Sequence, residues 1–98
     1  MFYTYVLQSI SDDGLYIGYS ADLRRRLAEH KAGAAQATSY RGPWNLIYYE
    51  AYTKEIDART REVILKSGAG RRLLKKQCRA HFAERPARSS LAKTAGRV

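Results

Sequence analysis

Five residues have side chains that could together hydrolyse a phosphodiester: Tyr5, Tyr16, Arg26, His30 and Glu62. The reaction needs an activated water, cancellation of charge on the phosphoryl group and a way for the leaving oxygen to depart. A single carboxylate can hold one Mg²⁺ when substrate oxygens and waters complete the shell. A guanidinium can fork onto the phosphate, and a histidine or a tyrosine of lowered pKa can take a proton. The inventory alone is not specific, because strand tyrosines are usually core or interface residues.

Two short strands must place the tyrosines. Residues 2–9 alternate in character and are rich in aromatic and β-branched side chains, which predicts a strand. Residues 15–20 predict the return strand, and the intervening Ser-Asp-Asp-Gly sequence is typical of a turn. The two segments therefore form a predicted β-hairpin.

The register of this hairpin decides how the tyrosines meet. A hairpin that closes symmetrically around residues 12 and 13 places Tyr5 opposite Ser20. Tyr5 and Tyr16 then point to the same side of the sheet, and Gly18 leaves an open space between them.

A helix over residues 21–32 must carry the arginine and the histidine. Ser20 is a suitable N-cap for it, and Gly33 is a suitable stop. Arg26 and His30 are one turn apart and flank the apolar stripe of this helix. We therefore expect both side chains at the margin of the core, beside the sheet.

The remaining pattern completes an α+β fold. Residues 44–52 predict a third antiparallel strand, and residues 54–66 and 69–82 predict two further helices. Glu62 falls on the first of these two helices. The expected architecture is a three-stranded antiparallel sheet flanked by about three helices.

Charge is distributed unevenly along the 98 residues. We expect one domain over residues 1–82 and a basic, disordered tail over residues 83–98, which lacks hydrophobic periodicity. Residues 71–98 carry +8 of the net charge of +9. This asymmetry favours a polyanion partner, most often nucleic acid, over a solubilising tail or an anionic membrane contact. No signal peptide or membrane-spanning run is found, so a cytoplasmic setting is expected.

The sequence excludes several familiar kinds of site. It has no zinc signature, P-loop, dinucleotide fingerprint or serine-nucleophile elbow. Cys78 is the single cysteine, so no internal disulfide can form, and its helical position predicts a buried thiol. His81 is expected at the surface. The five-residue group is therefore the candidate site.

The spacing of these residues resembles the GIY-YIG nuclease family. The first family motif matches Tyr3-Thr4-Tyr5, and the second matches Tyr16-Ile17-Gly18, with eleven positions from Tyr5 to Tyr16. The likeness covers about residues 2–76. Within the family the chain is most similar to the small stand-alone bacterial branch, because it has a Tyr-x-Tyr-x-Leu strand and Arg-Glu-x-x-x-Lys on a later helix.

The resemblance implies divalent-metal-dependent cleavage of DNA. Tyr5 or Tyr16 would activate or position the attacking water. The family's helix arginine falls on Arg26, which would stabilise the phosphoryl charge, and its histidine falls on His30, which would transfer protons. The family's metal-binding glutamate falls on Glu62, which would hold Mg²⁺ or Mn²⁺.

The chain departs from the family pattern at two positions. Tyr3 stands where the first motif has glycine, and the asparagine that many members place after the glutamate is missing. Lys66, one turn after Glu62, is a candidate for the phosphate contact of that asparagine. Further substrate contacts are expected at Gly18 and in the basic cluster of the last predicted helix: Arg71, Arg72, Lys75 and Lys76.

These observations support one leading hypothesis and two alternatives. The leading hypothesis is a metal-dependent DNA endonuclease with structural or weak sequence selectivity, acting in DNA repair or processing. Weak selectivity is expected because no groove-filling element for base readout is found. The first alternative is a catalytically weak nucleic-acid-binding module of the same fold. The second is a small interaction or stress-response protein whose basic tail is incidental.

Overall fold

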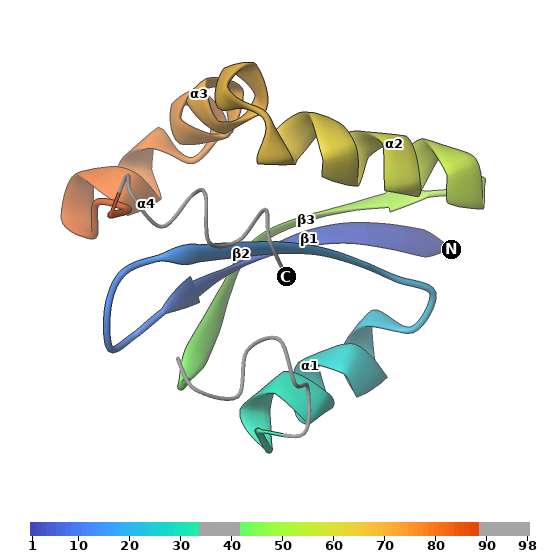
Figure 1. The fold of residues 1–98 in the computed structure, drawn as a ribbon, viewed down its shortest axis with the longest axis horizontal. Helices are drawn as coiled ribbons and strands as arrows, with labels where there is room; N and C mark the ends of the chain where they lie inside the picture. Colours follow the sequence, from blue (N-terminus) through green and yellow to red (C-terminus); the bar gives the residue numbers. More distant parts are fainter. Residues whose placement is uncertain (34–41, 89–98) are drawn as a thin grey trace.

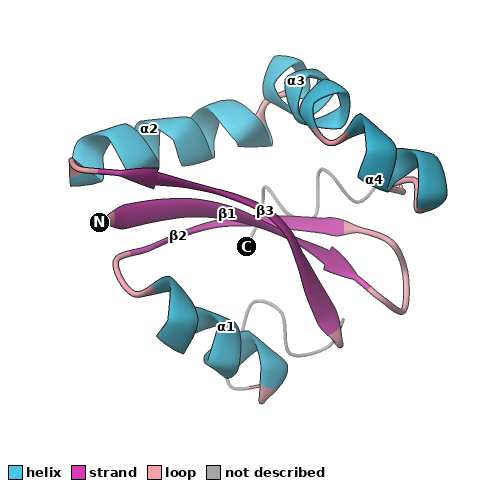
Figure 2. Ribbon diagram, turned by 180° about the vertical axis from the view of Figure 1, so that it is seen from behind, coloured by secondary structure: helices cyan, strands magenta, loops and turns pink. Residues whose placement is uncertain are grey.

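A three-stranded sheet forms the middle layer of the protein, with helices on both of its faces (Figure 1). The structure is a computed structural model that describes residues 1–33 and 42–88. Its elements, in chain order, are β1 (Phe2–Ser9), β2 (Leu15–Ser20), α1 (Leu23–Lys31), β3 (Trp44–Tyr52), α2 (Glu55–Lys66), α3 (Gly68–Gln77) and α4 (Arg79–Glu84). Seen from behind, α1 covers one face of the sheet, and α2, α3 and α4 lie on the other (Figure 2). The α+β class and the antiparallel sheet are as predicted, and four helices stand in the described ranges where about three were expected.

The strands are antiparallel in the order β2-β1-β3, so β1 is central. Tyr5 pairs with Gly18, whereas the predicted partner was Ser20. The predicted register is therefore wrong by two residues. Because side chains alternate between faces with a period of two, this shift leaves Tyr5 and Tyr16 on the same side, as expected.

The hairpin loop explains the shift in register. Ser9 N donates to Gly14 O at 2.8 Å, so the loop closes around residues 11 and 12 and not around residues 12 and 13. Asp13 adopts a φ of 63°, and Asp12 Oδ1 accepts from Gly14 N at 2.8 Å. Short polar side chains tolerate this left-handed conformation, which accounts for the choice of residues.

Alternation along the strands divides the buried side chains between two cores. The core beneath α2, α3 and α4 consists of Val6, Leu15, Ile17, Leu65, Leu74 and Phe82. The core beneath α1 consists of Tyr5, Leu7, Tyr16 and Leu23. Each large side chain that is fully buried contributes about 1.5–3 kcal/mol of hydrophobic free energy. The site tyrosines therefore belong to the smaller core, under a single helix.

Helix α1 begins later than predicted. Its N-cap is Asp22, whose Oδ1 accepts from Arg25 N at 3.2 Å. Ser20, the predicted cap, ends β2 and accepts from Asp22 N at 3.0 Å. The helix stops before Gly33, which has a φ of +75°, as the sequence predicted.

The predicted helix over residues 69–82 is in fact two helices. The backbone breaks at Cys78, which separates α3 from α4. Cys78 is partly buried against the larger core, and burial raises the pKa of its thiol. None of the helices in the described part of the chain is both long and apolar enough to span a membrane.

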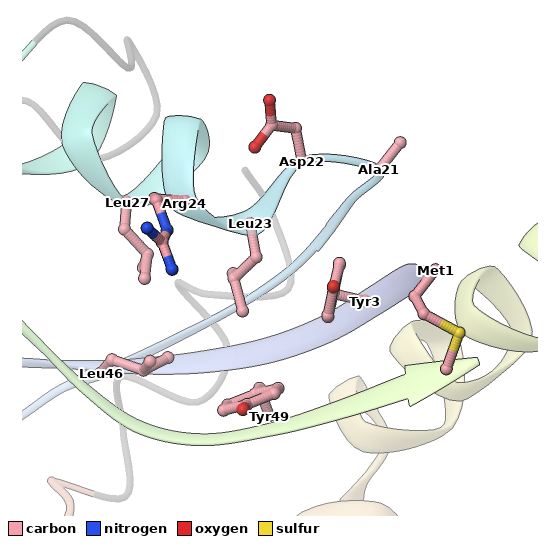
Figure 3. Close-up of a pocket in the computed structure, with 9 residues that line it drawn as sticks. All are labelled: Met1, Tyr3, Ala21, Asp22, Leu23, Arg24, Leu27, Leu46 and Tyr49. Atoms are coloured by element: carbon pink, nitrogen blue, oxygen red, sulfur yellow. The ribbon is translucent and has the colours of Figure 1, made fainter. Parts of the chain in front are cut away.

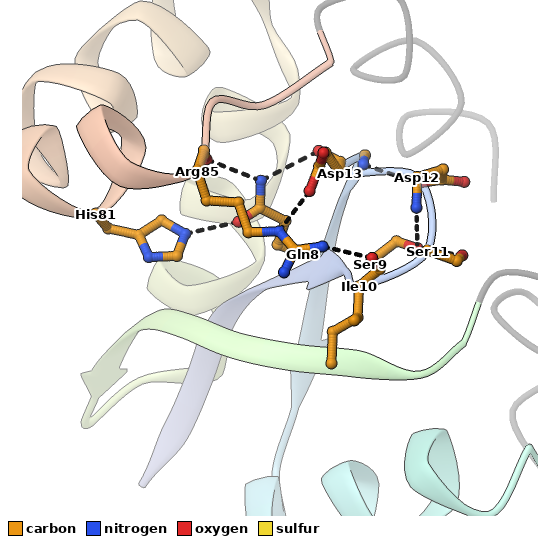
Figure 4. Close-up of polar contacts among 9 residues, drawn as sticks. Gln8, Ser9, Ile10, Ser11, Asp12, Asp13, His81 and Arg85 are labelled. Atoms are coloured by element: carbon orange, nitrogen blue, oxygen red, sulfur yellow. Dashed lines mark hydrogen bonds and ion pairs between the residues drawn. The ribbon is translucent and has the colours of Figure 1, made fainter.

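Helix α4 is tied to the β1–β2 loop by a polar cluster (Figure 4). The side chain of Gln8 is almost fully buried, and its Nε2 donates to the carbonyls of Asp13 and Arg85, each at 3.2 Å. The amide oxygen therefore faces His81, whose Nε2 donates to it at 2.6 Å. His81 is thus half-buried and bonded, and the prediction of a surface histidine is wrong.

The same cluster corrects the predicted start of the tail. Arg85 Nε donates to Asp13 Oδ1 at 2.5 Å, and Arg88 N donates to Asp13 O at 3.2 Å. Ala87 packs against the larger core. Residues 83–88 therefore belong to the folded domain, because their contacts with the hairpin are too distant in sequence for local periodicity to show. The remaining positions of the predicted tail, residues 89–98, lie outside the described residues.

Candidate active site

Tyr5 lies on the central strand, and its ring crosses the neighbouring strand at Gly18. The Tyr5 side chain is completely buried. A Cβ atom at Gly18 would lie 2.6 Å from both Cζ and Oη of Tyr5 and 3.0 Å from Cε1 of Tyr16. The space predicted at Gly18 is therefore filled by the two tyrosine rings, and any side chain at this position would displace the Tyr5 hydroxyl.

His30 reaches both tyrosines from α1. Its Nε2 lies 2.8 Å from Tyr5 Oη, which is hydrogen-bonding distance. The imidazole meets the rings of Tyr5 and Tyr16 edge-on, with centroids 5.7 and 5.3 Å away. His30 is only 4% exposed, so it lies inside the core. The prediction that it lies at the margin of the core is therefore wrong.

Burial sets the protonation states of this hydrogen-bonded pair. It lowers the pKa of His30 to about 4, and the positive charge of Arg26 acts in the same direction. Burial also raises the pKa of Tyr5 to about 12, although Arg26 opposes the shift. Both side chains are therefore neutral at pH 7.

Arg26 lies beside the tyrosine hydroxyls at the surface end of the group. Its guanidinium NH1 donates to Glu29 Oε1 at 2.8 Å. The pKa of Arg26 is raised, first by Glu29 and further by the hydroxyls of Tyr5 and Tyr16, against the effect of burial. About a third of its side chain remains exposed (34%), so an incoming phosphate can reach the charge.

Glu62 lies on α2, in the layer on the opposite face of the sheet from α1. Its Oε2 accepts from Lys66 Nζ at 2.8 Å, and the two side chains are 20% and 24% exposed. The negative charge of Glu62 contributes to the raised pKa of Tyr5, so the two groups are electrostatically coupled. Glu62 and Lys66, which the sequence places one helical turn apart, thus form an ion pair in the structure.

A half-buried cluster beneath α2 fixes this helix on the sheet. Arg61 Nε donates to both carboxylate oxygens of Glu50, at 3.0 and 3.2 Å. The hydroxyls of Tyr48 and Tyr52 donate to the same carboxylate. These bonds lower the pKa of Glu50 although burial acts against them. Because Arg61 directly precedes Glu62, the cluster sets the position of the proposed metal ligand.

The donor atoms near Glu62 suit a cation held by one carboxylate. No group of three or more His, Cys, Asp and Glu side chains gathers anywhere in residues 1–33 and 42–88. Mg²⁺ commonly binds through one or two carboxylates, with substrate phosphates and waters as the other ligands. Lys66 engages only Oε2 of Glu62 among the described residues, so this donor set fits such an ion.

The cations predicted to bind substrate lie apart from the tyrosines. Arg72, Lys75 and Lys76 are exposed on α3. Arg71 is half-buried, and its guanidinium donates to the carbonyl of Lys66. The structure therefore places this cluster beside the C-terminal end of α2, in the layer that supplies Glu62.

Two neighbours of the site were missed in the sequence. Glu29 orients Arg26, and its spacing of three residues on a helix is a signal that could have revealed the pair. Trp44 packs edge-on against Tyr16, with centroids 6.2 Å apart. Its placement depends on the pairing of β3 with β1, which no local pattern encodes.

Comparison with known proteins identifies relatives for this arrangement. The family model described as "GIY-YIG catalytic domain" matches residues 1–85. Two similar proteins are UPF0213 protein SpyM3_1077 of Streptococcus pyogenes serotype M3 and UPF0213 protein M28_Spy1146 of serotype M28. Each is 45% identical over 65 residues, which are 65% of this chain and 70% of the relative. No solved structure gives a significant match.

Proposed function

Because the chain belongs to the GIY-YIG family of catalytic domains, we propose that it is a divalent-metal-dependent endonuclease that hydrolyses DNA phosphodiester bonds. The observation that carries this proposal is the buried hydrogen bond between Tyr5 and His30 beside the partly exposed Arg26. A hydroxyl, a neutral imidazole and a guanidinium meet there. These groups supply proton transfer and phosphate charge neutralisation, which phosphodiester hydrolysis requires.

Tyr5 and His30 can move the proton of the attacking water together. With the proton of the imidazole on Nδ1, Nε2 of His30 accepts from the Tyr5 hydroxyl. Because the Tyr5 side chain is completely buried, this relay requires the bound substrate to bring the attacking water against its hydroxyl. Tyr5 then takes a proton from that water while it passes its own to His30. A direct ionisation of Tyr5 is disfavoured because burial raises its pKa to about 12.

Arg26 neutralises charge on the phosphoryl group in this proposal. Its pairing with Glu29 orients the guanidinium and leaves further N–H groups for phosphate oxygens. Tyr16 packs against His30 and limits the mobility of its ring. Gly18 leaves the room that the Tyr5 hydroxyl occupies beside His30.

Glu62 is the residue that would hold Mg²⁺ or Mn²⁺. A bound ion of this kind polarises the phosphoryl oxygen and lowers the pKa of a water. Lys66 balances the charge of Glu62 without substrate, and its ammonium group can turn to a phosphate oxygen when a cation takes the carboxylate. The cations of α3 extend the phosphate-binding surface: the exposed Arg72, Lys75 and Lys76, and the half-buried Arg71.

The proposed substrate is DNA with structural or weak sequence selectivity, in repair or processing. A second candidate function is a nucleic-acid-binding module that cleaves poorly. The ion pair between Glu62 and Lys66 favours this alternative, because the ammonium group competes with a metal ion for the carboxylate.

Plasmid and branched DNA incubated with purified protein test the proposal. We expect cleavage in Mg²⁺ or Mn²⁺, none in EDTA, and loss of cleavage in Glu62→Gln and Tyr5→Phe. Glu84→Gln, an exposed acid on α4, is the matched control and should cleave normally. Products formed in EDTA, or cleavage that survives both site variants, would contradict it. Salt-sensitive binding without any metal-dependent product would support the second candidate.

A further inference from the structure

A recess opens on the α1 face of the sheet, outside the proposed catalytic group (Figure 3). Its volume is about 540 Å³, within the range of small-ligand pockets. Leu23 and Leu27 of α1 form one wall, and side chains of β1 and β3 form the other. Ala21 and Asp22, in the turn that joins β2 to α1, also line the recess.

Two aromatic rings line the strand side of the recess. Tyr3 of β1 and Tyr49 of β3 have centroids 6.1 Å apart and planes tilted by 58°. Tyr49 is 53% exposed, which is unusual for a ring on the inner face of a sheet that a helix covers. Exposed aromatic rings beside cationic groups are the surfaces on which nucleobases stack.

The charges at the recess favour an anionic ligand. Arg24 lines it and has no ion pair or hydrogen bond with another described residue. The carboxylate at the rim is already engaged, because Asp22 accepts from Arg25 N at 3.2 Å and lies 3.9 Å from Arg25 Nε. The guanidinium of Arg24 is therefore available to a phosphate, whereas the Asp22 carboxylate already has Arg25 as its neighbour.

The recess also adjoins the proposed catalytic tyrosine. Tyr49 is the cross-strand partner of Tyr5 in the β1–β3 pair. The Tyr5 ring lies over Gly18 on the other side of β1. Two strand spacings of about 4.8 Å each therefore separate Gly18 from Tyr49 on the sheet. A ligand in the recess would therefore lie within about 10 Å, along the sheet, of the strand position that the Tyr5 ring covers.

We propose that this recess binds an unpaired nucleobase of the nucleic-acid substrate, stacked on Tyr49 and Tyr3, with Arg24 on its phosphate. The assignment rests on the proposed function and specifies its substrate class. A base within a duplex has both faces stacked and its edge paired, so it cannot enter a recess. Substrates with unpaired nucleotides next to the cleaved bond, such as flaps, gaps and junctions, are therefore preferred over a continuous duplex.

Fluorescence of 2-aminopurine tests the assignment without any need for cleavage. The probe is placed at successive unpaired positions of a flap oligonucleotide, with Glu62→Gln protein to keep the substrate intact. We expect quenching confined to one or two neighbouring positions, because a stacked base loses emission. Tyr49→Ala should remove this quenching and weaken binding of the flap roughly 5- to 100-fold. Tyr49→Phe retains the ring and should behave as the parent does.

Matched variants separate stacking from general effects. Tyr19→Ala removes a half-exposed ring from the other face of the sheet, where it packs against Arg59, and should leave the quenching unchanged. Arg24→Gln should weaken flap binding and reduce the slope of log affinity against log salt by about 1. Flap and duplex affinities should differ less in Tyr49→Ala than in the parent.

The outcomes distinguish the two proposals. Quenching at every position, or at none, together with unchanged flap binding by Tyr49→Ala, would overturn the base-binding role of the recess. Metal-dependent cleavage of duplex DNA would in that case still support the nuclease. Absence of nucleic-acid binding at low salt would overturn both. Dimerisation that is lost in Tyr49→Ala, with no effect on flap binding, would assign the recess to a second copy of the chain and overturn the base-binding role.

Discussion

At the residue scale, burial both brings Tyr5 and His30 together and keeps them neutral. The imidazole is 4% exposed and the tyrosine is fully buried, yet their polar atoms satisfy each other at 2.8 Å. The absence of a side chain at Gly18 makes this bond possible. The residue identities and their shared side of the sheet were predictable from the sequence, but the depth of His30 was not. Depth depends on how closely α1 packs on the sheet, and the spacing of apolar residues does not encode that closeness.

Acid should destabilise the fold through His30. Its pKa is about 4 in the folded protein and about 6.5 when unfolded, so the unfolded chain binds more protons between these values. This contribution to stability is complete above pH 6.5 and is lost as the pH falls toward 4, by up to about 3 kcal/mol. Urea unfolding at several pH values measures it. The free energy of unfolding should fall less steeply with falling pH in His30→Gln than in the parent protein. An equal pH dependence in both proteins would contradict the assignment.

At the scale of elements, α2 is the critical support, because it carries Glu62, the proposed metal ligand, whereas the other proposed site residues lie on the α1 face. Its attachments are specific: Arg61 is paired with Glu50, and Thr4 Oγ1 donates to Ala58 O at 2.6 Å. Helix α3 then turns back against α2 with very little clearance at Gly70. The three strands and the ranges of α1 and α2 followed closely from periodicity and turn residues. Caps, the break at Cys78 and the hairpin register did not, because each depends on hydrogen bonds formed after the chain has folded.

Among the glycines in the described residues, Gly70 should tolerate substitution least. A Cβ there would lie 1.8 Å from Ile64 O, which belongs to the preceding helix, so the two helices would have to separate. Gly70→Ala should lower the free energy of unfolding by about 3 kcal/mol or more. Gly68→Ala, two residues earlier, meets nothing closer than Arg72 NH1 at 3.5 Å and should be neutral or slightly stabilising. Denaturant unfolding compares the pair, and equal losses would show that α2 and α3 are not closely packed at Gly70.

At the scale of the whole molecule, the charge distribution complements the site. The net charge is +9, and the cations of α3 lie beside the end of α2 that bears Glu62. A polyanion bound along these cations therefore passes the layer that supplies the proposed metal ligand. The charge asymmetry was visible in the sequence, whereas its position relative to the tyrosines required the order of layers. The contribution of residues 83–88 to the folded domain was equally invisible, because Arg85 meets Asp13 only across the folded chain.

Salt dependence should report the α3 cations directly. Each phosphate contact that is lost reduces the slope of log affinity against log salt by about 0.9 on duplex DNA. Lys75→Gln combined with Lys76→Gln should therefore reduce the slope by about 2, with a uniform loss of affinity across DNA sequences. Lys54→Gln, an exposed lysine at the start of α2, is the control for net charge. An equal change in slope for Lys54→Gln would show a diffuse field and not a binding surface.

The single-turnover cleavage rate of Tyr5→Phe in saturating Mg²⁺ is the most direct test of whether the buried Tyr5 hydroxyl takes part in cleavage. This variant keeps the ring and removes only the hydroxyl that bonds His30. We predict a rate at least about 100-fold below that of the parent protein. Tyr19→Phe, which loses a hydroxyl on the same sheet but outside the site, should cleave at the parent rate. Equal rates for Tyr5→Phe and the parent, in a folded protein that still needs metal, would contradict a catalytic role for the buried tyrosine–histidine pair.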